Sequence, residues 1–305
     1  MEGLHERPRS RAWLHVALFL AAVITTLDAG RGLIDPGGRL ISGWPYAATL
    51  LGILAAHEFG HYGLARWYRV DASLPYFIPV PFGVGTFGAV MRMRDAPPSR
   101  RATLDIGLAG PIAGFAVALP LLLWGLAHST VVDSASLPTA GLDSPWLVLQ
   151  AWREGRLQAA ASDGTMQLMG DSLVTWGAQR LVWGALPAGK DLVLHPVAFA
   201  AWLGMLVTAL NLVPLGQLDG GHALYALLGR ARAERVSRLV SWALLGCGLF
   251  LSFNWLVWWA LTRFAVGPRH PPSWDERPLD PPRVALAAVG LLLFALTFVP
   301  VPFAF

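Results

Sequence analysis

Long apolar runs follow one another along most of the chain and are separated by polar segments. Six of these runs approach the roughly 20 apolar residues that a helix needs to cross a bilayer. They cover residues 12–27, 44–65, 106–126, 193–213, 240–261 and 284–301. The pattern predicts an all-α polytopic membrane protein with about six transmembrane helices.

The first run could also be a signal peptide, because three arginines precede it. No A-x-A cleavage signal follows it, which favours a retained helix. The short segment before the run includes Glu2 and Glu6, which is not typical of an organelle transit peptide. We therefore expect a multi-pass protein of a bacterial or archaeal cell membrane.

Two segments depart from the helical pattern. Residues 76–94 are apolar but contain prolines and Gly83, Gly85 and Gly88, which favours a Gly-rich β-hairpin over a helix. Because lipid does not tolerate open strand edges, this membrane-associated hairpin must lie against protein or line a wet cavity. Residues 127–192 carry two helical patterns, one opened by Ser144 and Pro145 and one by Asp171 and Ser172, which predict an interfacial amphipathic insertion.

Composition supports a membrane protein. Hydrophobic residues make up 55% of the chain and charged residues 14%, whereas a soluble domain has about 45–50% and about 25%. The net charge is +4, but the arginines stand singly or in pairs between apolar runs, so we expect no nucleic-acid partner. The single cysteine, Cys247, excludes an internal disulfide.

The basic residues also predict an orientation. With a cytoplasmic N-terminus, the inner flanks hold more than half of the 23 basic residues. Because cytoplasmic flanks are enriched in Arg and Lys, both termini are expected in the cytoplasm. The inner residues are Arg7, Arg9, Arg11, Arg66, Arg69, Arg92, Arg94, Arg100, Arg101, Arg230, Arg232, Arg235 and Arg238.

The second apolar run carries the first candidate chemistry. Glu58 is the one formally charged residue between positions 40 and 65, and it lies in the sequence HEFGH. His57 and His61 are four residues apart, so a helix presents both imidazoles on one face, where they can share a metal ion. A chance pair of packed histidines would leave a buried carboxylate unexplained, at a cost of about 2.5–3.5 kcal/mol at a helix centre.

A catalytic zinc site usually has three protein ligands and leaves one position for water. The candidate third ligand is Asp219 in NLVPLGQLDGGH, the one formally charged residue between positions 196 and 229. Pro214 interrupts the helix before it, while Gly220 and Gly221 allow a close backbone approach. The alternative is that Asp219 is an N-cap for the following short helix.

These motifs together resemble the site-2 protease family of intramembrane zinc metalloproteases. HEFGH in an apolar helix is followed by the hairpin sequence GTFGA, by LAGPIAG at the start of the next run, and by NLVPLGQLDGG. The resemblance covers about residues 44–229, which would be the catalytic core of a single membrane-embedded peptidase domain spanning 1–305. It is greatest to the PDZ-less branch.

The resemblance implies a six-helix fold and one zinc ion held by His57, His61 and Asp219. It implies that Glu58 is the catalytic general base and acid, and that Asn211 stabilises the tetrahedral intermediate. Zinc would activate water for attack on the peptide carbonyl, with Glu58 accepting and then donating the proton.

The expected substrates are single-pass membrane proteins, and the expected surroundings are the lipid bilayer. A substrate helix must unwind before cleavage, and its bare amides then need partners. The edge of the hairpin, with Gly85, Thr86 and Gly88, is predicted to offer them by strand addition. Gly110 and Gly114 form a G-x-x-x-G pair that is expected to pack beneath the metal-binding helix.

Two other classes of protein remain open at this point. Two histidines and a carboxylate also form the ligand set of non-haem iron enzymes, so a membrane oxygenase or desaturase is one alternative. A non-catalytic zinc-binding scaffold or carrier is the other. A carrier would be expected to spread ligands over several spans, and an idle scaffold would have no use for Glu58.

Overall fold

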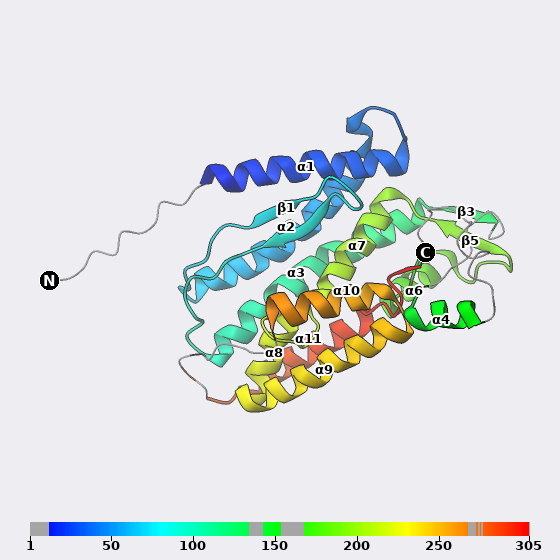
Figure 1. The fold of residues 1–305 in the computed structure, drawn as a ribbon. Helices are drawn as coiled ribbons and strands as arrows, with labels where there is room; N and C mark the ends of the chain where they lie inside the picture. The colour runs from blue at the N-terminus through cyan, green and yellow to red at the C-terminus, as the bar shows by residue number, and fades with distance from the viewer. Residues whose placement is uncertain are drawn as a thin grey trace.

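The computed structural model describes residues 12–133, 143–153, 168–267, 273, 275 and 277–304. Helices lie side by side along most of the molecule, and short paired strands lie beside them and at one end (Figure 1). The helices are α1 (Ala12–Ile34), α2 (Trp44–Trp67), α3 (Arg100–Ala127), α4 (Pro145–Arg153), α6 (Leu173–Trp183), α7 (Pro196–Asn211), α8 (Asp219–Leu228), α9 (Arg230–Phe250), α10 (Phe253–Leu261) and α11 (Pro281–Thr297). The strands are β1 (Tyr76–Pro79), β2 (Thr86–Val90), β3 (Thr130–Asp133), β4 (Leu168–Met169), β5 (Lys190–Val193) and β6 (Phe303–Ala304).

The prediction of six spans is not confirmed. Within the described ranges, three helical segments are long and apolar enough to cross a membrane: Ala12–Ile34, Leu40–Trp67 and Arg100–Ala127. The fourth and sixth predicted spans form the shorter apolar helices α7, of 16 residues, and α11, of 17 residues. The sequence pattern located these helices, but the chain turns out of each helix before the apolar run ends.

The fifth predicted span is divided into two helices. The chain turns at Leu251 and Ser252, and α10 packs back against α9 (Figure 1). A side chain at Gly248 would meet Leu256 at 2.6 Å, so the glycine permits the close contact between the two helices. Ser252 caps α10 by accepting a hydrogen bond from the Asn254 amide.

The core forms where α2, α3 and α7 meet. Small residues let these helices approach closely, because a Cβ at Gly60 would lie 2.5 Å from the Ala109 carbonyl oxygen of α3. A Cβ at Gly204 of α7 would likewise lie 2.7 Å from the Ile53 side chain of α2. Helix α7 is buried along most of its length, so both of its neighbours hold it in place.

A β-hairpin lies between α1 and α2 (Figure 1). Strand β1 pairs antiparallel with β2 in the register Tyr76 to Val90 and Phe77 to Ala89. The turn between the strands is fixed to the helices, since the Thr25 hydroxyl donates to the Gly85 carbonyl (2.6 Å). The strand pairing agrees with the predicted hairpin, whereas its association with a membrane stays a prediction.

The predicted insertion at 127–192 is only partly helical. Helices α4 and α6 begin where the sequence predicted, and Ser172 forms a capping box with Thr175. Strand β3 pairs with β5, and β4 pairs with β6 near the C-terminus; neither pairing was predicted. Residues 134–142 and 154–167 of this insertion lie outside the described residues.

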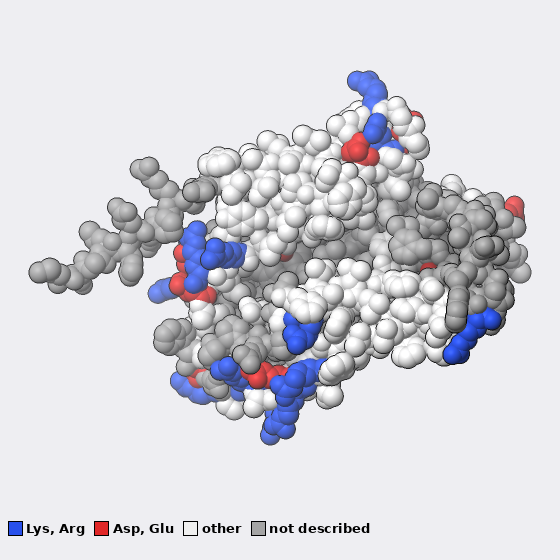
Figure 2. Space-filling view, viewed as in Figure 1, with Lys and Arg blue, Asp and Glu red and all other residues white. Residues whose placement is uncertain are grey.

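Charged side chains gather mainly at the ends of the molecule, and most of the middle of the visible face is uncharged (Figure 2). Many of the largest exposed residues are apolar, including Trp13, Trp67 and Trp242. An exposed apolar surface of this kind is typical of a protein surrounded by lipid. The same face is hollowed between the hairpin and α10 (Figures 1 and 2).

Candidate metal centre

Three side chains from two distant segments meet inside the bundle. His57 Nε2 lies 3.2 Å from His61 Nε2. Asp219 Oδ2 lies 3.3 Å from the first of these atoms and 3.4 Å from the second. Ligand atoms at 2.0–2.2 Å from a tetrahedral zinc ion are about 3.3–3.6 Å apart. The three atoms therefore match one face of a zinc coordination tetrahedron, whose fourth corner a water molecule would take.

A backbone carbonyl fixes the orientation of His61. Its Nδ1 lies 2.7 Å from the carbonyl oxygen of Ile106, which can only accept a hydrogen bond. The ring proton is therefore on Nδ1, and the lone pair of Nε2 faces His57 and Asp219. Metal-binding histidines usually have their second nitrogen held in this way.

Glycines of α3 make room for both rings. A Cβ at Gly110 would overlap the imidazole of His61, and one at Gly114 would lie 3.2 Å from Cβ of His57. The predicted packing of this glycine pair beneath the metal-binding helix is confirmed. Any larger residue at Gly110 would push α3 away or displace His61.

Asp219 reaches the histidines because the chain breaks between α7 and α8. Asp219 is the first residue of α8, and the N-cap position belongs to Leu218, which makes no side-chain cap. The N-cap alternative for Asp219 is therefore wrong. A Cβ at Gly220 would collide with the Leu212 carbonyl, so glycine is needed where α8 begins against the preceding turn.

Asn211 and Glu58 lie beside the three ligand atoms. Asn211 is the last residue of α7, and its amide nitrogen is 3.4 Å from His57 Nε2. Glu58 is buried, with 6% of its surface exposed, and its carboxylate lies near the backbone of Met91. The carboxylate is also close enough to His61 and Asp219 to interact with both electrostatically.

The comparison with known families agrees with this geometry. Residues 45–254 match the model of peptidase family M50. The matched range includes both the histidine motif and Asp219. The chain belongs to the M50, or site-2 protease, family.

Named members of the family extend the comparison. The chain is 31% identical over 268 residues to a protein of Arabidopsis thaliana named probable zinc metalloprotease EGY2, chloroplastic. It is 32% identical over 260 residues to probable zinc metalloprotease EGY1 of the same plant. These alignments cover 87% and 84% of this chain, but the chain spans only 43% of the length of either relative. No solved structure gives a significant match.

Membership of the M50 family implies zinc as the metal, and the donor set fits it. Two imidazole nitrogens and one carboxylate oxygen are typical ligands of a catalytic zinc ion. Within the described part of the chain, His57, His61 and Asp219 form a group of candidate ligands that lie close enough together to hold one ion.

The structure gives the three hairpin residues different environments. Gly85 has a φ of +84°, and its Cβ would lie 2.6 Å from the Thr25 carbonyl oxygen of α1. Thr86 is buried, and its hydroxyl donates to the Ile78 carbonyl at 2.9 Å inside the hairpin. Gly88 has a φ of +94° with open space around the position of a Cβ. Gly85 and Thr86 therefore shape the hairpin, while Gly88 borders open space.

Sequence reasoning missed the backbone group and the supporting ion pair of the centre. The Ile106 carbonyl acts through a main-chain atom, which residue types do not reveal. Asp105 pairs with Arg283, 178 residues away. No local sequence signal indicates that pairing.

Proposed function

We propose that this chain is an intramembrane zinc metalloendopeptidase that cleaves transmembrane segments of single-pass membrane proteins. One observation carries the proposal: three ligand atoms with the spacing of a tetrahedral face lie beside a buried glutamate on an apolar helix. The expected stoichiometry is one zinc per chain, held by His57, His61 and Asp219.

Zinc at this position would supply a Lewis acid that makes water nucleophilic at neutral pH and polarises the scissile carbonyl. Glu58 would accept the proton of the attacking water and pass it to the leaving amine. Asn211 would donate a hydrogen bond to the developing oxyanion from its place beside His57.

The substrate is proposed to bind as an extended strand along the hairpin. The sheet of β1 and β2 has two strands, so each strand has one edge without a strand neighbour in that sheet. Phe82 and Phe87 are largely exposed near the turn, where apolar side chains of an unwound substrate could pack. Strand addition would satisfy the substrate amides that unwinding exposes.

The proposed domain and location follow the same observations. Residues 1–305 would form one membrane-embedded domain with a catalytic core at about 44–229, which the family match to 45–254 supports. The proposed orientation places both termini in the cytoplasm of a bacterial or archaeal cell. The arginine pattern supports the orientation only. The similar proteins are named as chloroplastic and give no support to a bacterial or archaeal source. The family match gives no support to an iron oxygenase or a scaffold.

A reconstituted assay tests the proposal. The full chain in lipid vesicles is incubated with a panel of single-pass membrane proteins, before and after zinc removal by a chelator. Cleavage within a transmembrane segment that stops with the chelator and returns with zinc is expected. Cleavage that persists without metal would contradict the proposal.

A further inference from the structure

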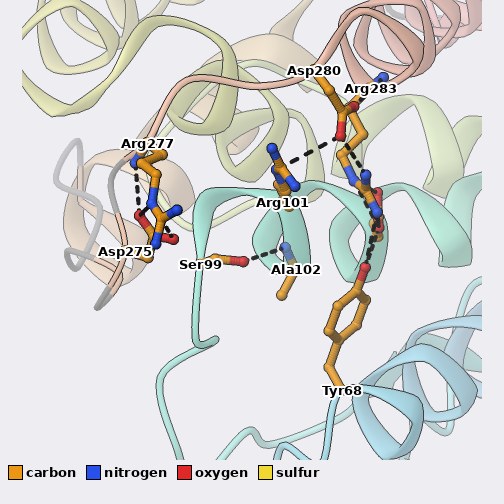
Figure 3. A network of polar contacts seen from close by, with 9 residues as sticks. Tyr68, Ser99, Arg101, Ala102, Asp275, Arg277, Asp280 and Arg283 are labelled. Atoms are coloured by element: carbon orange, nitrogen blue, oxygen red, sulfur yellow. Dashed lines mark hydrogen bonds and ion pairs between the residues drawn. The ribbon is translucent and has the colours of Figure 1, made fainter.

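A cluster of polar side chains joins the end of α2 to the first turns of α3 and α11 (Figure 3). The Asp105 carboxylate on α3 accepts hydrogen bonds from Arg283 on α11, at 3.1 Å from Nε and 2.8 Å from Nη2. The hydroxyl of Tyr68, at the end of α2, also donates to Asp105. Burial and the bond to Asp105 raise the pKa of Tyr68, so the hydroxyl keeps its proton.

The inner part of the cluster is well shielded. The Asp105 side chain is only 12% exposed, so its bonds to Arg283 are stronger than those of a surface ion pair. Arg283 is held from its other side by Asp280, at 2.8 Å from Nη1. Asp280 also accepts from the Arg283 backbone as the N-cap of α11, which fixes the start of that helix.

The cluster is one residue away from the group that orients a metal ligand. Asp105 precedes Ile106, whose carbonyl accepts the Nδ1 proton of His61. Tyr68 is the C-cap residue directly after α2, and it follows His61 by seven residues, or about two helical turns. Two hydrogen bonds therefore join the C-terminal end of α2 to the first turns of α3: one from Tyr68 to Asp105 and one from His61 to the Ile106 carbonyl.

We propose that Tyr68, Asp105 and Arg283 are positioning residues for the metal centre. They hold the first turns of α3 against the end of α2, so that the Ile106 carbonyl keeps the His61 proton on Nδ1 and directs Nε2 to the metal. None of the three is a candidate metal ligand. The inference rests on the metal centre alone, and no part of it depends on the identity of the substrate.

The zinc dissociation constant measures this role directly. Loss of groups that orient a metal ligand typically weakens metal binding about 10- to 100-fold. We expect an increase of that size for Arg283→Gln and for Asp105→Asn, and a smaller increase for Tyr68→Phe. Arg283→Lys keeps the charge and should recover part of the affinity.

The experiment uses the full chain in lipid nanodiscs, with zinc affinity measured by competition with a chelator. Substitution of cobalt for zinc adds a visible spectrum that reports on ligand geometry, and the melting temperature of the metal-free protein reports on stability. Arg277→Gln is the matched control, because Arg277 forms an exposed ion pair with Asp275 in the segment before α11. This control should keep the wild-type affinity and cobalt spectrum.

Weaker zinc binding with an altered cobalt spectrum, at a metal-free melting temperature near wild type, would support the proposal. Wild-type affinity in both Arg283→Gln and Asp105→Asn would overturn it. A loss of zinc affinity that is accompanied by a lower melting temperature of the metal-free protein, and that Arg283→Lys does not restore, would also overturn the proposal. If the two variants do not fold, Tyr68→Phe decides in the same assay, and unchanged affinity there overturns the proposal.

Discussion

At the scale of single residues, Gly110 controls whether His61 can face the metal. We predict that Gly110→Ala weakens zinc binding at least tenfold, because the new methyl group overlaps the imidazole ring. Overpacking at this contact should also destabilise the fold by about 1–3 kcal/mol. Chelator competition and thermal unfolding measure the two effects.

Gly52→Ala provides the control for this substitution. Gly52 lies on α2, and nothing comes within 4 Å of the position of a Cβ there. The same change should leave zinc affinity at the wild-type value. Equal affinities in both variants would contradict a role for the contact between α3 and His61 in zinc binding.

The ligands themselves give a second prediction at this scale. Asp219→Ala and His57→Ala should each lose most of the bound zinc, since two remaining ligands seldom hold the ion. Metal analysis of the purified protein measures the zinc content per chain. Asp71→Ala is the control, because Asp71 forms a half-exposed pair with Arg94. Full zinc content in both ligand variants would refute the assignment.

The sequence predicts the ligand residues but not their supports. His57, His61 and Asp219 stand out because each is a polar residue in an apolar segment, where burial without a partner is costly. The supports are a carbonyl at Ile106 and an ion pair between Asp105 and Arg283. A carbonyl is present in every residue, and the ion pair joins distant positions, so neither leaves a local pattern.

At the scale of elements, the hairpin gives a prediction that separates substrate binding from metal binding. Gly88→Val should reduce cleavage about tenfold or more, because a positive φ strains a valine by about 1–3 kcal/mol and its side chain enters open space beside β2. Zinc content should stay at the wild-type value. Substrates that carry Gly or Pro near the scissile bond should lose least, since they arrive partly unwound.

Gly189→Val is a matched control for the hairpin variant. Gly189 also has a positive φ and open space around it, but it precedes β5, which lies at one end of the molecule and away from the hairpin (Figure 1). Normal cleavage in Gly189→Val together with reduced cleavage in Gly88→Val would support docking on the hairpin. Normal cleavage in both, or loss of zinc in Gly88→Val, would count against it. Gly85→Val is less informative, because it collides with α1.

Elements are predictable where local signals are present. The hairpin follows from its prolines and glycines, and α6 follows from its capping residues. The division of the fifth span was not foreseen, because residues 240–261 form one apolar run. Contacts with the C-terminal segment stabilise the bend. The side-chain amide of Asn254 donates to the Phe303 carbonyl, and the Trp255 indole donates to the Pro300 carbonyl.

At the scale of the whole molecule, the metal centre lies toward one end of the helices. His61 is six residues from the end of α2, and α3 begins at that same end (Figure 1). Several arginines that are expected on the cytoplasmic side lie at this end: Arg66 is near the end of α2, and Arg100 and Arg101 begin α3. We predict that the metal centre is close to the cytoplasmic surface.

Cysteine labelling of intact cells checks this orientation. A cysteine placed in residues 94–99 should react with membrane-impermeant reagents only after the membrane is opened. One placed in residues 184–189 should react from outside. Cys247 is replaced beforehand so that the signal comes from the new cysteine alone. The reverse labelling pattern would place the metal centre on the outer side.

The proteolytic role of Glu58 is tested most directly by Glu58→Gln in reconstituted vesicles. Zinc content and cleavage of a single-pass substrate are measured on the same sample, beside wild-type protein. Glutamine keeps the shape of the side chain and cannot transfer the proton. We expect one zinc per chain and a fall in cleavage of at least about 100-fold, as for loss of a general base. Cleavage near the wild-type rate in a zinc-loaded Glu58→Gln sample would contradict the proposed mechanism.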